Sequence, residues 1–227
     1  MGLRYQMSPP LEYLENLQLL FLDRDQLEEA AREALVCSCS PLEHLEAQKF
    51  RFEKDRNEFL LTRGFLRQRL GQRLGLLPGS VPQWRDTHKK LHTDGTHFNV
   101  SHTQRVSLIG IHNHPLGVDV ECINPATATE ALMKTVCHSS ERKYLTQLND
   151  KDRIKAFFRM WCRKEALLKA IGLGLELDPK AIDSKLEHPV FCFEFNQILY
   201  CIQDIHLSDF GLEDLASQFS CAICSSR

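Results

Sequence analysis

The sequence lacks several features that would assign it to a broad class. No run approaches the roughly 18 apolar residues that a membrane span needs. The longest candidate, Leu17 to Leu22, is interrupted by Gln18, and the chain start lacks the basic-then-apolar layout of a signal peptide. Net charge is nearly absent: 28 Lys and Arg against 30 Asp and Glu give −2, which argues against general nucleic-acid coating. We therefore expect no membrane anchor and no nucleic-acid partner.

A disulfide framework and a zinc site are also not expected. Nine cysteines is an odd number, and without a secretory signal they indicate reduced, mostly buried thiols in a cytoplasmic protein. Cys221 and Cys224 form the only pair at CxxC spacing, and no second such pair completes a zinc site. His112 and His114 would share one face of an extended segment, but no third ligand lies near them in sequence.

A basic segment stands out in this chain, whose 227 residues are 43% hydrophobic and can build a substantial core. Residues 51–90, called the basic island below, hold ten Lys and Arg against four Asp and Glu. The island thus carries +6 and the rest of the chain −8. Such a concentration indicates a site for phosphate or an acidic partner. A solvated helix face explains the same charges, so charge alone leaves both interpretations open.

Hydrophobic spacing predicts helices in two blocks. Pro41 suits the first turn of a helix, and Gly172 suits a helix end. The predicted helices cover Leu11–Leu35 with an interruption near Asp23, Leu45–Leu74 with an early break, Ala126–Val136, Ser139–Leu148 and Asp150–Ile171.

Short β-branched and apolar runs predict strands after each block of helices. These runs are His97–Val100, Val106–His112, Gly117–Ile123, Val190–Phe195, Ile198–Ile205 and Gln218–Cys224. The order is helices then strands, repeated once, with no long polar linker between the repeats. We expect an α+β fold of two similar α/β halves, residues 1–113 and 114–227, joined near His114.

Two carboxylates stand two residues apart in Gly117-Val118-Asp119-Val120-Glu121. On a strand, Asp119 and Glu121 point to the same face while the valines face the other way. Two like charges held together are costly unless a cation neutralises them, and oxygen ligands suit Mg²⁺. Solvated acids on a surface strand explain the pattern equally well when it is taken alone.

A second motif lies on the predicted helix Asp150–Ile171. Trp161, Glu165 and Lys169 fall on one side of that helix, so a third carboxylate sits one turn before a lysine. This pair could complete a metal site and hold a phosphate. An ordinary helical ion pair worth about 0.3 kcal/mol is the plainer interpretation.

A third motif, Phe98-Asn99-Val100-Ser101-His102-Thr103, lies where a strand meets a turn. A histidine at a strand end is often only a packing residue. Beside Ser101, however, His102 could bind an anion through side-chain and backbone donors.

Together and in this order, the three motifs resemble the surfactin-type 4′-phosphopantetheinyl transferases. The resemblance covers residues 50–175 well and the ends of the chain poorly. It implies Mg²⁺-dependent transfer of the phosphopantetheine arm of coenzyme A to a serine of an acyl, peptidyl or aryl carrier protein, with release of 3′,5′-ADP. It also implies two α/β halves about a pseudo-twofold axis, coenzyme A in the cleft between them, and a monomer.

The resemblance implies roles residue by residue. Asp119, Glu121 and Glu165 match the family's metal-binding acids, which accept magnesium or manganese. Glu165 is our first candidate for the base that activates the carrier serine, Glu121 is the second, and Lys169 would contact the pyrophosphate. The other residues expected to bind coenzyme A are Lys54, Arg85, Lys90, Ser101, His102 and Lys164.

The chain departs from the family pattern in two basic segments. The family's Gly-Lys-Pro element is Lys89-Lys90-Leu91 here, so only Lys90 matches. Some bacterial relatives bind the 3′-phosphate of coenzyme A through lysines where this chain has Glu43 and Glu46. That contact must come from elsewhere, such as Lys54 and Lys49.

Two other functions fit the same residues. One is a Mg²⁺-dependent phosphodiesterase acting on coenzyme A-like nucleotides with water as the nucleophile. The other is a catalytically silent module that binds coenzyme A or a carrier protein, although such a module would need neither three acids nor Lys169. Fatty-acid, polyketide and nonribosomal-peptide carriers are equally allowed, and their recognition is expected near residues 123–150.

Overall fold

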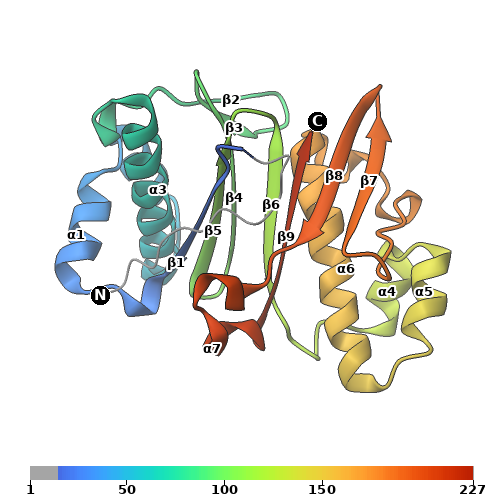
Figure 1. Ribbon diagram of the computed structural model, residues 1–227. Coiled ribbons are helices and arrows are strands. Elements are labelled where there is room, and N and C mark those ends of the chain that lie inside the picture. The colour runs from blue at the N-terminus through green and yellow to red at the C-terminus, as the bar shows by residue number, and fades with distance from the viewer. Residues whose placement is uncertain (1–14, 227) are drawn as a thin grey trace.

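The computed structural model describes residues 15–226 and contains two antiparallel sheets that meet in the middle of the molecule (Figure 1). The first sheet has the order β1 (Gln18–Asp23), β5 (Val106–His112), β4 (His97–Thr103). The second has the order β6 (Leu116–Cys122), β9 (Phe219–Ser226), β8 (Ile198–Asp204), β7 (Val190–Phe195). A short ribbon of β2 (Trp84–Arg85) and β3 (Leu91–His92) lies beside the first sheet.

Each sheet carries one long helix of 22 residues. On the first sheet this is α3 (Glu53–Leu74), which also packs against α1 (Glu29–Cys37) and α2 (Pro41–Ala47). On the second it is α6 (Asp150–Ile171), with α4 (Glu130–Val136) and α5 (Ser139–Leu145) packed on its outer side. Short helical turns complete the described chain: Arg24–Gln26, Pro78–Ser80, Gly174–Glu176, Pro179–Ala181, Leu207–Phe210 and α7 (Glu213–Ala216).

A hydrophobic core is shared between the two sheets. Alternation along β1 sends Leu19 and Phe21 into this shared core and Leu20 and Leu22 toward α3. From the second sheet, residues of β6 and β9 such as Val118 enter the same core. The strands where the two sheets meet are thus covered on both faces, and all seven residues of β5 are buried.

The predicted α+β class with two similar halves is confirmed. The chain passes from the first sheet to the second in the loop that contains His114, between β5 and β6. The helix Asp150–Ile171 has the predicted bounds: Asn149 caps its start by accepting from the backbone nitrogen of Asp152, and Gly172 ends it at φ 89°. None of the helices between residues 15 and 226 could cross a bilayer.

One predicted helix is wrong in its first part. Leu11–Leu35 was expected to be helical up to an interruption near Asp23, yet Gln18–Asp23 is strand β1. A strand buried on both faces has no polar positions to reveal a period of two, so its apolar run resembles part of a helix. Residues 11–14 of that prediction lie outside the described residues.

The expectation that all cysteines are reduced is also wrong for one pair. Cys192 on β7 and Cys201 on β8 are direct partners across the antiparallel hairpin and form a disulfide, with their Cα atoms 4.2 Å apart. The pairing depends on the register of the hairpin, which spacing along the sequence does not reveal. The other seven cysteines are free thiols, and five of them are buried.

Gly117 sets how closely α6 approaches β6. A Cβ atom there would collide with the carbonyl oxygen of Ala166 and lie 2.5 Å from the backbone nitrogen of Ala170. Only glycine therefore allows these two elements to pack at the observed separation.

Replacing Gly117 with alanine should lower the free energy of unfolding by about 1–3 kcal/mol, because the helix must move away from the strand. Chemical denaturation would measure this loss. Gly79→Ala is the matched control, since the nearest atom to its Cβ would be 4.0 Å away. Equal stability of the two variants would contradict the packing argument.

Candidate active site

The polar contacts of Lys169 join three elements from both halves of the molecule. Its Nζ atom lies 2.6 Å from Asp119 Oδ1 and 3.0 Å from Ser101 Oγ, and the Ser101 hydroxyl donates to the same Asp119 oxygen at 2.8 Å. Helix α6, strand β6 and strand β4 thus meet at one buried carboxylate that is only 2% exposed. The acids of β6 are therefore not solvated groups on a surface strand.

Strands β4 and β6 belong to different sheets and are held together here by side chains. The backbone nitrogen of Val118 donates to Asn99 Oδ1 at 2.9 Å, and that of Val120 donates to Ser101 Oγ at 3.3 Å. The side chains of alternate β4 residues thus accept the backbone hydrogen bonds that the carbonyl oxygens of a neighbouring strand would accept in a regular sheet. Asn99 and Ser101 have a structural task in this seam.

Glu121 lies two residues beyond Asp119 and close to α6. Its Oε1 atom accepts from the indole nitrogen of Trp161 at 3.3 Å. Burial, followed by the negative charge of Asp119, raises the pKa of Glu121 to about 7. Glu121 can therefore exchange a proton near neutral pH.

Glu165 completes a group of three acids with Asp119 and Glu121. Burial raises the pKa of Glu165, while Lys169 opposes the rise and Asp119 adds to it. The charge of Glu165 also contributes to the raised pKa of Glu121. The predicted helix face of Trp161, Glu165 and Lys169 does lie against the acids of β6.

The three acids are candidate ligands for a divalent cation. Across residues 15–226, no three His, Cys, Asp or Glu side chains are arranged to hold an ion, and the Lys169 ammonium occupies one oxygen of Asp119. The other oxygen, Asp119 Oδ2, is buried without a hydrogen-bond partner among the described residues. A hard cation would give this unpaired oxygen a partner and would reduce the repulsion between the carboxylates. The carboxylate oxygens therefore suit Mg²⁺ or Mn²⁺ by type, but as the structure places the described residues they do not form a closed metal site.

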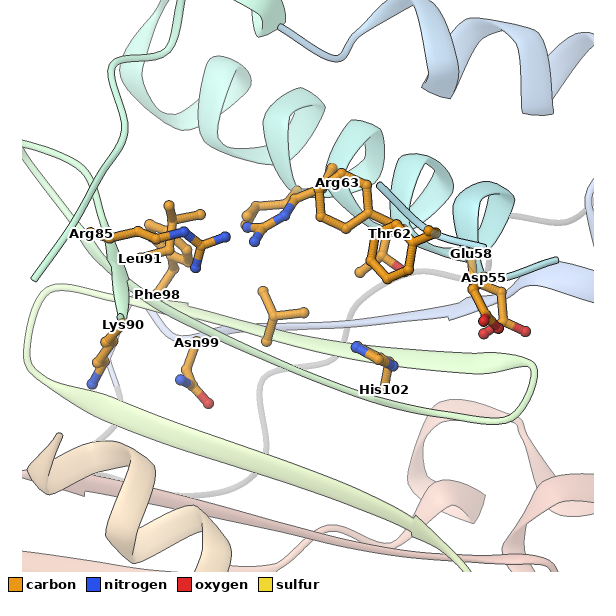
Figure 2. A pocket seen from close by; sticks show the side chains of 14 residues that line it. Asp55, Glu58, Thr62, Arg63, Arg85, Lys90, Leu91, Phe98, Asn99 and His102 are labelled. Atoms are coloured by element: carbon orange, nitrogen blue, oxygen red, sulfur yellow. The ribbon is translucent and has the colours of Figure 1, made fainter. Parts of the chain in front are cut away.

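A cavity of about 420 Å³ lies between α3 and β4, on the other face of β4 from Asp119 (Figure 2). Its aromatic and aliphatic lining includes Phe50, Phe59 and Phe98, and its cationic lining comes from Arg63, Arg85 and Lys90. Burial lowers the pKa of Lys90, whose Nζ donates to the backbone oxygen of Lys169 at 2.6 Å. Flat apolar walls with cationic groups suit a nucleotide.

The structure separates Ser101 from His102, which were expected to hold a phosphate together. Because successive strand residues face opposite ways, His102 lines the cavity while Ser101 is buried against Asp119. Burial, then the charges of Arg24 and Lys169, lower the pKa of His102. His102 is thus the member of the pair that faces a ligand.

Lys164, which was expected to bind coenzyme A, does not line the cavity. It is fully buried, its Nζ lies 2.6 Å from Glu141 Oε2, and it donates to the backbone oxygens of Val136 and Pro179. A lysine next to a site residue in sequence points to a different side of the helix. Lys164 instead fastens α4 and α5 to α6.

Lys54 is likewise not brought to the cavity. Its side chain is 80% exposed, and its ammonium lies 4.0 Å from Glu58 one turn along α3. Arg63, from the same helix, lines the cavity although it was not singled out among the ten cations of the basic island. The sequence offered one indication of this role: Arg63 lies one helical turn after the aromatic Phe59, which also lines the cavity.

A cavity lined by cations thus lies beside a buried acid–lysine cluster. The half of the chain that holds the acids and Lys169 is similar to known proteins. Residues 115–224 match the family model described as the 4′-phosphopantetheinyl transferase superfamily.

Three curated relatives carry the same description. The chain is 34% identical over 154 residues to the 4′-phosphopantetheinyl transferase HetI of Nostoc sp., covering 65% of each protein. It is 34% identical over 79 residues to gsp of Aneurinibacillus migulanus, covering 35% of this chain and 32% of the relative. It is 30% identical over 81 residues to Sfp of Bacillus subtilis, covering 36% and 35%. The aligned chain thus spans less than two thirds of each relative. The similarity to this superfamily covers residues 115–224, just under half of the chain.

The raised pKa of Glu121 predicts a pH-dependent stability. A carboxyl whose pKa rises from 4.5 to about 7 on folding favours the folded state when protonated, and that contribution is lost as pH rises from about 4.5 through 7. Glu121→Gln should therefore become more stable than the parent protein above pH 7, by about 1–2 kcal/mol, because water partly screens this carboxyl. Denaturation across pH 4–9 in the presence of a chelator measures the difference. Parallel curves would contradict the assignment.

The buried position of Lys164 predicts a structural defect on its removal. Lys164→Met would leave the Glu141 carboxylate without its buried cation, at a cost of about 3–5 kcal/mol in the free energy of unfolding. The exposed Lys143 on α5 provides the control, and its Met variant should change stability by less than about 0.5 kcal/mol. Urea denaturation of both variants decides, and equal effects would show that Lys164 is dispensable.

Proposed function

We propose that the protein is a surfactin-type 4′-phosphopantetheinyl transferase that moves the phosphopantetheine arm of coenzyme A to a serine of an apo carrier protein. The observation that carries the proposal is the contact of Lys169 with Asp119 and Ser101. This contact links the acid cluster to the strand that also lines the nucleotide-sized cavity. Relatives named as such transferases, HetI and Sfp among them, support it.

Coenzyme A would bind with its nucleotide in the cavity between α3 and β4. Arg85, Lys90 and His102 line that cavity and supply donors for phosphate oxygens. The pyrophosphate would lie toward Lys169, whose ammonium stands between the cavity wall and the acids. A ligand phosphate there would compete with Asp119 for this ammonium and free the carboxylate.

The reaction is an in-line displacement at the β-phosphorus of coenzyme A. Glu165 accepts the proton of the attacking serine hydroxyl, the new O–P bond forms, and 3′,5′-ADP leaves with the electron pair of the broken P–O bond. The raised pKa of Glu165 suits a base that works near neutral pH. Asp119, Glu121 and Glu165 would hold Mg²⁺ or Mn²⁺, which would neutralise charge on the phosphate.

The halves would divide at residues 113 and 114, with the nucleotide cavity in the first and the acids in the second. Acyl, peptidyl and aryl carriers are all candidates for the acceptor, and we propose that a monomer acts on them in the cytoplasm.

Mass spectrometry of an apo carrier protein incubated with coenzyme A and Mg²⁺ tests this function directly. The expected result is a carrier heavier by one phosphopantetheine group on its serine. A parallel reaction without carrier tests the rival function. Hydrolysis of coenzyme A there, with an unmodified carrier in the first reaction, would replace the transferase by a phosphodiesterase. If neither product forms although coenzyme A binds, the protein is a catalytically silent binding module.

Replacing Glu165 with glutamine should lower the turnover number by about 100-fold or more while largely sparing coenzyme A binding, because the amide cannot accept the serine proton. Carrier modification and calorimetric binding would be measured in parallel. The exposed Glu213 on α7 gives a matched control as Glu213→Gln, with unchanged turnover expected. Full turnover in the Glu165 variant would remove this residue from the chemistry.

A further inference from the structure

A second cavity lies in the second half of the molecule and shares no lining residue with the cavity between α3 and β4. It has a volume of about 410 Å³ and is bounded by α6, by the ends of β6 and β8, and by the start of β9, near α7 (Figure 1). Ile123, which follows β6, and Ser220, which pairs with Glu121 across the ladder, both line it. The second cavity therefore adjoins the strand that carries the acids but is not part of the site described above.

The floor of the second cavity is apolar. Four of its lining residues are buried and belong to the core that the two sheets share: Ile205, Leu207, Phe219 and Cys221. Ala216 of α7 is an exposed residue of the same lining. Buried hydrocarbon walls in a space of this size suit a ligand with an apolar body.

Cations follow one face of α6 beside the second cavity. They stand four residues apart and are therefore neighbours on the helix surface: Lys151, Lys155, Arg159 and Arg163. Like charges at this spacing destabilise a helix. Within residues 15–226, neither Lys151 nor Lys155 forms an ion pair with a carboxylate, and Lys155 and Arg159 both line the cavity. The row therefore favours an anion at the place where it meets the cavity.

The carboxylate in the lining, Asp204, is already neutralised. Its Oδ1 atom lies 2.7 Å from Arg163 Nε, and its Oδ2 atom lies 2.5 Å from Arg159 Nε. Two guanidinium groups share this one negative charge, so the row keeps surplus positive charge. Among the described residues, Arg159 uses only its Nε atom in hydrogen bonds, and its side chain is 37% exposed. The two terminal nitrogens of Arg159 can therefore donate to a ligand.

We propose that the second cavity binds a monocarboxylate with an apolar body, such as a medium-chain fatty acid. Its head group would lie between Lys155 and Arg159, and its hydrocarbon chain would lie on the apolar floor. A planar carboxylate matches the two parallel N–H donors at the end of a guanidinium group. A dianion such as a phosphate monoester suits the cavity less well, because Asp204 would repel its second charge.

Calorimetric titration of the full-length protein with octanoate, octan-1-ol and acetate tests the proposal. Octanoate has both the charge and the apolar body, whereas octan-1-ol lacks the charge and acetate lacks the body. Octanoate should bind at least about 100-fold more tightly than acetate, because each buried CH₂ group contributes about fourfold. It should bind about tenfold more tightly than octan-1-ol, because only the carboxylate forms charge-assisted hydrogen bonds.

Substitutions in the lining separate the two parts of the site. Lys155→Met should weaken octanoate binding about tenfold and leave octan-1-ol binding unchanged, and Lys155→Arg should retain the affinity for octanoate. Ala216→Phe should fill the cavity and weaken both ligands about tenfold or more. Two controls should keep the parent affinity: Lys151→Met, in the same row but outside the lining, and Arg63→Met, in the cavity between α3 and β4.

Three results would overturn the proposal. Equal binding of octanoate and octan-1-ol would show that the cations do not hold the head group. Octanoate binding that Ala216→Phe leaves intact, or that Arg63→Met abolishes, would place the ligand elsewhere. Because none of these measurements uses coenzyme A or a carrier, their outcome does not depend on the transferase function. Thermal unfolding of each variant establishes that the compared proteins are folded.

Discussion

The arrangement of the site depends on the contact between the Lys169 ammonium and the buried Asp119 carboxylate. A carboxylate that is 2% exposed needs a cation and donors, and here the cation comes from α6 while a further donor, Ser101, comes from β4. The same three groups connect two sheets that share no ladder hydrogen bonds at this seam. Because the buried Asp119 carboxylate needs both a cation and a hydrogen-bond donor, it constrains how α6, β6 and β4 meet between the two halves.

Charge is divided between the two halves, and this division has a chemical use. Guanidinium groups from α3 and β2 line the cavity, whereas the acids of β6 and α6 lie across β4 from it. A ligand with several phosphates needs permanent cations for the groups that only anchor it. In the proposed reaction, a metal held by the acids would supply positive charge at the phosphorus that reacts. The near-zero net charge of the chain conceals this separation.

Features with a local cause could be predicted from the sequence. The bounds of α6 follow from its amphipathic pattern, its Asn149 cap and Gly172, and the common face of Asp119 and Glu121 follows from strand alternation. Features set by tertiary packing could not. Strand β1 is buried on both faces, so its sequence does not alternate between apolar and polar residues. The disulfide depends on the register of the β7–β8 hairpin. Lys164 is buried against Glu141, although its neighbour Glu165 faces the acids of β6. The sequence does not distinguish Arg63 from the other nine cations of the basic island, because only the fold places it in the lining of the cavity.

The core shared by the two sheets also bears on how the protein folds. Val118 of β6 and Leu19 of β1 lie in one hydrophobic cluster although almost a hundred positions separate them along the chain. Neither sheet can cover its inner apolar face alone. An isolated half would therefore expose a large apolar surface and tend to aggregate. Loss of structure in one half should thus spread to the other in a single cooperative transition, and loops must close over long distances before native packing can compensate their entropy.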